Sequence, residues 1–199
     1  MAKSQSDILK EVLAKLGKHG ILDNIIVIGS WCLPLYQEHY FDTESISVLR
    51  TRDIDLLVGR HIKFAEKVDV PVLLENMGFI LEHSYPDGHM RLSHPELIIE
   101  LLVPEKGRGS SKPFPVPDLS MNAQRLRHLE LLEKETIRVK AYGTEIRIPH
   151  PVYFGLHKLI VASKRFDKSK RNRDIDSGKL ILRLLIKKGE LKKIRGVLD

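Results

Sequence analysis

The sequence lacks two features that define large classes of protein. It has one cysteine, Cys32, in 199 residues, which excludes an intrachain disulfide and a zinc site built from several thiolates. It also has no run of 18 consecutive apolar residues, and charged residues interrupt the apolar positions of the segment 1–16. These absences argue against a membrane-spanning helix and a signal peptide. We therefore expect a cytoplasmic protein without membrane attachment.

The composition is that of a folded chain whose charge is unevenly distributed. Hydrophobic residues make up 42%, charged residues make up 30%, and the net charge is +7. The length fits one domain, or one domain with a small appendage. Residues 151–199 contain 14 Lys and Arg against 5 Asp and Glu, whereas residues 1–150 contain 19 against 21. Such a basic end is typical either of a surface that binds phosphates or nucleic acid, or of a solvated helical face.

The spacing of apolar residues predicts strands through most of the chain and helices at its end. Strands are expected at 25–28, 53–58, 79–83, 89–93, 97–103, 136–140 and 145–148. Helices are expected at 8–16, 31–38 with Ser30 as the N-cap, 71–77, from Pro151 onward, and 174–188. The segment 104–118 holds four prolines and is predicted to be an exposed, mobile loop.

This order of elements predicts an α+β fold, in which a mixed sheet flanked by helices is followed by a helical C-terminal part. We expect a domain boundary between residues 1–149, which contain the sheet, and residues 150–199, which form a basic helical subdomain.

Two aspartates lie one residue apart in the predicted strand 53–58. Because side chains alternate along a strand, Asp53 and Asp55 lie on the same face and Ile54 on the other. Two such carboxylates stay ionised at neutral pH only with a positive group between them, and oxygen ligands favour magnesium. The solvated face of an edge strand would also account for the pattern, without a metal.

A third acidic residue, Glu100, interrupts the apolar run 97–103. A carboxylate in a mostly buried strand needs a partner. That partner is either a metal shared with Asp53 and Asp55, or a cation such as Arg91 on the preceding predicted strand.

Gly29 and Ser30 follow the first predicted strand. Without a Cβ, Gly29 lets a phosphate approach the backbone, and the N-terminus of a helix favours an anion. The hydroxyl of Ser30 would add a donor. The same dipeptide is also typical of a simple turn with an N-cap.

The order of these motifs resembles that of the DNA polymerase beta-like nucleotidyltransferase superfamily. The resemblance rests on Ile28-Gly29-Ser30-Trp31, on Asp53-Ile54-Asp55 and on Ile99-Glu100-Leu101. It is greatest to small microbial nucleotidyltransferases and to related toxins of abortive-infection systems, in which a helical half follows the catalytic sheet. Here 22 residues separate Ser30 from Asp53, so an insertion is expected around residues 39–50. The third acid is Glu where Asp is commoner.

The resemblance implies an enzyme that transfers a nucleoside monophosphate from a nucleoside triphosphate, such as ATP, to an acceptor hydroxyl, with release of pyrophosphate. It implies that Asp53, Asp55 and Glu100 hold two Mg²⁺ ions. It further implies that Gly29, Ser30, Lys158 and Asp174 bind the nucleotide, with Lys158 reaching the triphosphate. A helix cap is the structural alternative for Asp174.

The basic end suggests RNA, tRNA or another phosphate-bearing molecule as the acceptor. A toxin that modifies tRNA is one version of this hypothesis. The alternative is a non-catalytic nucleic-acid-binding module with the same fold, in which residues 168–173 contact the phosphate backbone.

Overall fold

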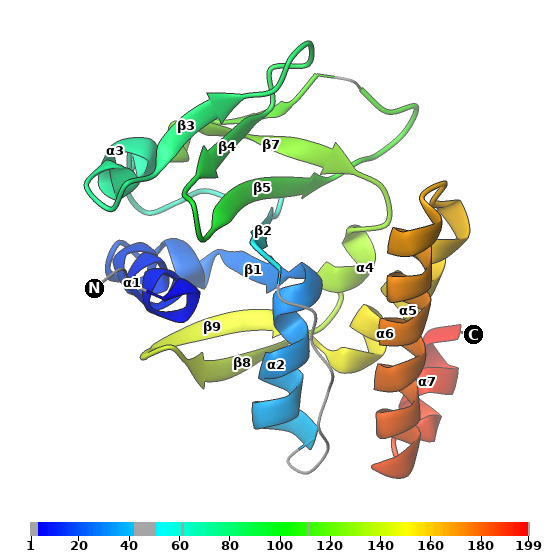
Figure 1. Cartoon of the computed structure of the whole chain (residues 1–199). Helices are drawn as coiled ribbons and strands as arrows, with labels where there is room; N and C mark the ends of the chain where they lie inside the picture. Colours follow the sequence, from blue (N-terminus) through cyan, green and yellow to red (C-terminus); the bar gives the residue numbers. More distant parts are fainter. Residues whose placement is uncertain (1–3, 42–50, 61, 111, 199) are drawn as a thin grey trace.

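The computed structural model of the chain describes residues 4–41, 51–60, 62–110 and 112–198 (Figure 1). Its strands are β1 (Ile25–Ile28), β2 (Asp53–Val58), β3 (Ile80–His83), β4 (Met90–Ser93), β5 (Ile98–Pro104), β6 (Phe114–Val116), β7 (Met121–Leu126), β8 (Thr136–Ala141) and β9 (Thr144–Pro149). Its α-helices are α1 (Gln5–Lys18), α2 (Cys32–Tyr36), α3 (Val70–Glu75), α4 (Glu130–Glu133), α5 (Pro151–Lys164), α6 (Lys168–Lys187) and α7 (Leu191–Leu198).

The central sheet is mixed, as predicted. Its main path runs β1-β2-β5-β4-β3, and β5 pairs in parallel with β2 and antiparallel with β4. The last residues of β5 extend beyond its pairing with β4. On the same edge they pair in parallel with β7, which in turn pairs with β6. The hairpin of β8 and β9 forms a separate two-stranded sheet. The predicted fold class is confirmed.

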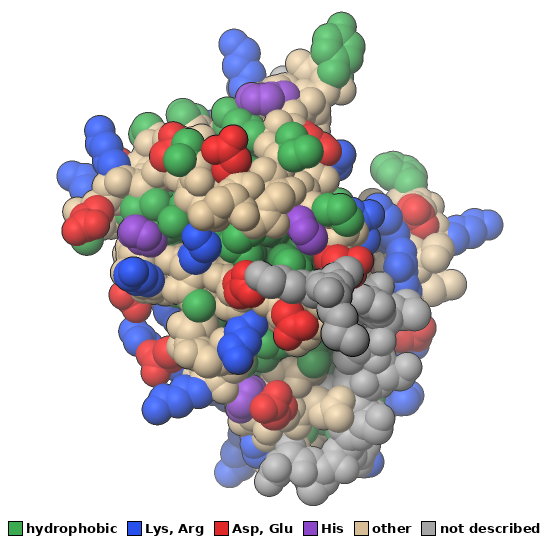
Figure 2. All heavy atoms as spheres, turned by 60° about the vertical axis from the view of Figure 1, so that its left-hand side comes forward, with side chains coloured by type: hydrophobic (Ala, Val, Ile, Leu, Met, Phe, Trp, Pro, Cys, Tyr) green, Lys and Arg blue, Asp and Glu red, His purple; other side chains and the backbone are tan. Residues whose placement is uncertain are grey.

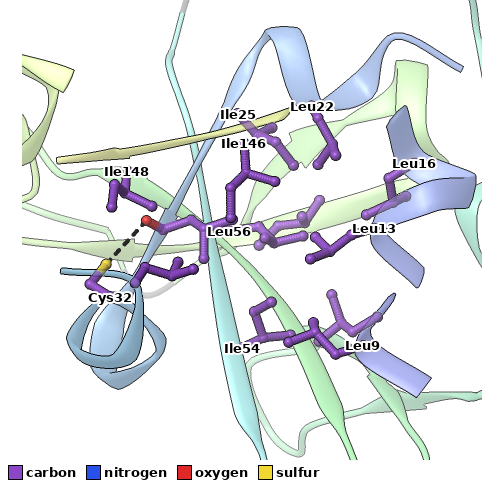
Figure 3. Close-up of a cluster of buried hydrophobic side chains, with 14 of the residues drawn as sticks. Leu9, Leu13, Leu16, Leu22, Ile25, Cys32, Ile54, Leu56, Ile146 and Ile148 are labelled. Carbon is purple, nitrogen blue, oxygen red and sulfur yellow. Dashed lines mark hydrogen bonds between the residues drawn. The ribbon is translucent and has the colours of Figure 1, made fainter. Parts of the chain in front are cut away.

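One face of the sheet packs on α1. The leucine stripe of α1 lies against Ile54 and Leu56 of β2, and the apolar side chains of β9 complete this core (Figure 3). The alternate side chains of these strands, such as Leu57 and Leu102, point to the other face of the sheet and form a smaller cluster with α4. The apolar alternation of β2 and β5 therefore fixes which face carries their acidic residues.

Helices α5, α6 and α7 lie side by side on one flank of the molecule, and α1 and α3 lie on the opposite flank (Figure 1). Helix α5 begins at Pro151, and the ring of His150 caps it by accepting a hydrogen bond from Val152 N. The predicted boundary between residues 149 and 150 falls at this junction and stays a prediction. On the face shown in Figure 2, acidic and basic side chains are interspersed.

Three expectations about local structure are wrong. Ser30 is not an N-cap, because residues Gly29–Trp31 form a 3₁₀ turn and α2 begins at Cys32 without a side-chain cap. Helix α6 begins at Lys168 instead of residue 174, because Asp167 caps it through Lys170 N. The segment 104–118 is not all loop, because β6 pairs with β7 within it.

Strand β7 and helix α4 were not predicted. The expected insertion at 39–50 lies largely outside the described residues. Among the helices that the structure describes, none combines the length and the apolar character needed to cross a membrane.

Candidate active site

Three acidic side chains share one face of the sheet. In the parallel pairing of β2 with β5, Asp55 lies directly opposite Glu100, and Asp53 lies opposite Ile98. Because Asp53 precedes Asp55 by two residues, all three carboxylates lie on the same side. Asp53 is exposed, whereas Asp55 and Glu100 are partly buried. The sequence-predicted acids are thus brought together on adjacent strands.

The electrostatics of this face disfavour three negative charges. Burial, followed by the charges of Glu100 and Asp53, raises the pKa of Asp55 to about 6, although the charge of Lys158 opposes this shift. Within the described residues, neither Asp53 nor Asp55 forms an ion pair with a Lys or Arg. The face has the hard oxygen donors that Mg²⁺ prefers, and a divalent cation would relieve their repulsion.

The three carboxylates do not form a closed ligand set by themselves. In the part of the chain that the structure describes, no group of three or more Asp, Glu, His or Cys side chains is arranged to hold a metal ion. Of the three acids, Asp55 and Glu100 are the two that lie directly opposite each other in the register of β2 and β5. Any ion bound there would take further oxygen ligands, as Mg²⁺ usually does from water and substrate phosphates.

Gly29 brings bare backbone against this pair. Its φ of +75° lies in the left-handed region, and a Cβ at this position would lie 2.4 Å from Oδ2 of Asp55. The antiparallel pairing of Ile28 with Asp55 produces this approach. Ser30 follows in the same 3₁₀ turn and is partly buried. The two predicted nucleotide-binding residues therefore lie beside the acidic face.

The ion pair considered between Glu100 and Arg91 does not form. Arg91 lies opposite Glu100 in the register of β4 and β5, but its Nε donates to Glu82 Oε2 at 2.7 Å. A histidine that sequence reasoning missed lies closer to Glu100: Nε2 of His89 is 3.9 Å from Glu100 Oε1. The signal was the hairpin itself, because His89 precedes Arg91 by two residues and so shares the face of Glu100.

Lys158 and Asp174 bind each other. Asp174 is buried in α6, and its carboxylate pairs with Lys158 Nζ at 2.9 Å and with Arg165 Nε at 2.5 Å. The helix-cap alternative for Asp174 is wrong, because Asp174 lies well inside α6. The charges of Lys158 and Arg165 both lower the pKa of Asp55, against the larger effect of burial. This cationic pair thus lies within electrostatic reach of the acidic face.

Comparisons with known proteins bear on the family and the fold of the chain. The sequence model of a family described as nucleotidyltransferase matches residues 7–194. Among solved structures, an antigenic nucleotidyltransferase-like protein from Paracoccidioides brasiliensis superposes with a TM-score of 0.51 at 12% identity. The match covers 91% of this chain and 76% of that one, and at this identity it shows a common fold. A search of curated proteins gave no significant match.

Proposed function

The chain belongs to a family of nucleotidyltransferases, and from this premise we propose that its acidic face catalyses a magnesium-dependent nucleotidyl transfer. In this reaction the oxygen of an acceptor hydroxyl attacks the α-phosphorus of a nucleoside triphosphate. The hydroxyl releases its proton to solvent as a bond forms between its oxygen and the α-phosphorus. The bond from that phosphorus to the oxygen bridging the α- and β-phosphates breaks, and pyrophosphate leaves. The observation that carries the proposal is the register that sets Asp55 opposite Glu100, with Asp53 on the same face.

Asp53, Asp55 and Glu100 are the residues that would hold two Mg²⁺ ions. When bound, Mg²⁺ neutralises phosphate charge and makes the acceptor hydroxyl easier to deprotonate. The raised pKa of Asp55, which comes from burial and from the neighbouring acids, supports a cation at this place. The face therefore has both the ligand type and the electrostatic need for a divalent ion.

Gly29 and Ser30 are proposed to receive the triphosphate. The bare backbone at Gly29 lets the carboxylate of Asp55 lie directly against this turn, so a phosphate bound by the turn would lie beside the acidic face. Lys158 and Arg165 supply positive charge from the helical flank, and Asp174 holds both. The burial of Asp174 favours a role in positioning these cations, whereas its direct contact with the nucleotide stays a prediction.

The acceptor is proposed to be RNA, tRNA or another phosphate-bearing molecule. The first turns of α6 carry four basic side chains, Lys168, Lys170, Arg171 and Arg173, and all four are exposed. Phe166, in the connection to α5, is fully exposed beside them. Cations next to an exposed ring are typical of surfaces that bind single-stranded nucleic acid. The same surface supports the alternative of a non-catalytic nucleic-acid-binding module.

One experiment separates these two functions. The protein is incubated with each labelled nucleoside triphosphate, Mg²⁺ and total cellular RNA. The enzyme should transfer label, and Asp55→Asn should abolish transfer while Asp23→Asn, which removes an exposed carboxylate elsewhere, should not. Salt-sensitive RNA binding that is independent of Mg²⁺, with no label transferred to RNA, protein or small metabolites, would favour the binding module.

A further inference from the structure

The imidazole of His89 is buried next to the proposed catalytic acids, and neither ring nitrogen has a hydrogen-bonding partner among the described residues. The residue is 4% exposed. Burying an unpaired polar group is costly, so such groups in folded proteins usually have a specific reason. A charged group does lie near the ring: Glu100, whose Oε1 is 3.9 Å from Nε2.

The hairpin of β3 and β4 holds this imidazole in place through its backbone. His89 N donates to Asp87 Oδ1 at 3.3 Å, and His89 O accepts from Ser84 N at 2.8 Å. Asn122 of β7 braces the neighbouring residues, since it accepts from Met90 N at 2.8 Å and donates to Gly88 O at 3.0 Å. The backbone from which the ring extends is therefore held by the turn of the hairpin and by β7.

The same hairpin keeps a guanidinium away from Glu100. Arg91 is paired with Glu82 across β3 and β4, although it lies opposite Glu100 in the other direction. An arginine can hold both oxygens of a carboxylate at once, whereas an imidazole N–H takes one. A histidine here can therefore orient Glu100 and still leave one oxygen for another ligand.

We propose that His89 is a positioning residue for Glu100. The Nε2–H of His89 donates a hydrogen bond to one carboxylate oxygen of Glu100 and so directs the other oxygen toward a divalent cation. This inference rests on the proposed function. The present distance of 3.9 Å exceeds that of a hydrogen bond. The Glu100 side chain would have to turn toward His89 when the cation binds, and hydrogen bonds in active sites commonly shorten when the ligands are bound. Metal-binding carboxylates are typically oriented in this way by neighbouring groups.

The test measures metal affinity and folding separately. Mn²⁺ serves as the probe and is titrated by electron paramagnetic resonance. His89→Leu, which lacks a donor, should weaken Mn²⁺ binding by about 10- to 100-fold. His89→Gln, which keeps an N–H, should stay within a few fold of the wild type. Thermal unfolding in EDTA should show His89→Leu at least as stable as the wild type, because an unpaired polar group has been removed.

The control is His83→Leu, which changes an exposed histidine of the same hairpin and should leave Mn²⁺ binding unchanged. If His89→Leu does not fold, His89→Met replaces it, because the flexible Met side chain fills irregular space. It should weaken Mn²⁺ binding to the same extent. Wild-type affinity in either apolar variant overturns the role of His89, as does a His89→Gln variant that binds as weakly as they do. If wild-type protein does not bind Mn²⁺, or if Asp55→Asn binds it normally, the metal site of the proposed function fails as well.

Discussion

The Cα of Gly29 approaches the carboxylate of Asp55 so closely that position 29 has no room for a side chain. A Cβ there would lie 2.4 Å from Oδ2 and 3.3 Å from Cγ of Asp55. The first of these separations is shorter than real Cβ contacts allow. The glycine that follows β1 and the aspartate of β2 therefore form one unit, in which the backbone of the first limits the position of the second.

Gly29→Ala should lower nucleotidyl transfer sharply. The substitution forces Asp55 to move and places an L-residue at a φ of +75°, which costs about 1–2 kcal/mol in backbone strain alone. The matched control is Gly107→Ala, because Gly107 has a φ of +70° and a methyl group added there would meet no described atom within 4 Å. Both variants carry the strain, so denaturant unfolding should show a loss in each, at least as large in Gly29→Ala because of its added contact with Asp55, while label transfer falls only in Gly29→Ala. Equal activities would contradict the role of this contact.

The raised pKa of Asp55 predicts a pH dependence of stability in metal-free protein. The pKa is about 6 in the fold because of burial and the nearby acids, against an ordinary value of 3.8. A carboxyl whose pKa is raised on folding stabilises the fold most below its unfolded pKa and loses this contribution as the pH rises through its folded pKa. The loss corresponds to about 3 kcal/mol.

Asp55→Asn should remove that loss. In EDTA, the variant should be more stable than the wild type at about pH 8 and similar to it at about pH 3, below the unfolded pKa, as measured by denaturant unfolding. Mg²⁺ binding by the wild type requires the ionised carboxylate and should strengthen over the same interval. Identical slopes of stability against pH in the two proteins would show that Asp55 is not perturbed.

Asp174→Asn should destabilise the fold and weaken binding of the triphosphate. The substitution leaves Lys158, which is 14% exposed, without its negative partner. Breaking a buried ion pair in this way costs about 3 kcal/mol. Asp176→Asn, at an exposed position of the same helix, is the control and should change neither property. The measurements are thermal unfolding and the KM for the nucleotide. An unchanged KM would show that this ion pair does not contribute to nucleotide binding.

The crossing of α5 and α6 depends on two glycines. A Cβ on Gly178 would lie 2.9 Å from Gly155 O and 2.9 Å from Cδ2 of Leu159. Gly178→Ala should therefore destabilise the protein by about 1–3 kcal/mol, the usual cost of overpacking. Gly196→Ala, in α7 with open space around it, should be neutral or stabilising because alanine favours helix. Chemical denaturation of both variants measures the difference, and equal stabilities would show that the crossing tolerates a methyl group.

The parts of the fold that the sequence predicted are those with a strong local pattern. In β2, Ile54, Leu56 and Val58 alternate with two acids, so both the strand and its acidic face follow from residue order alone. The hairpin of β3 and β4 follows from its turn residues in the same way. The candidate acids were found because their chemistry is unusual within apolar strands.

The parts that the sequence did not predict depend on tertiary contacts. Strand β7 alternates weakly and owes its conformation to pairing with β5 and β6. The first turns of α6 have exposed polar side chains, so no apolar stripe marks them, and the cap at Asp167 starts the helix. The approach of His89 to Glu100 also requires the register of β4 with β5, which the spacing of the hairpin residues alone does not encode.

The parallel pairing of β2 with β5 also has a consequence for how the chain folds. A slip of one residue would turn Glu100 into the apolar layer beneath the sheet and bring Ile99 and Leu101 out of it. That error is expensive because it desolvates a charge and exposes two large aliphatic side chains. The acid proposed for catalysis thus also helps to specify the alignment of the two strands, because the misaligned pairing is the less stable one.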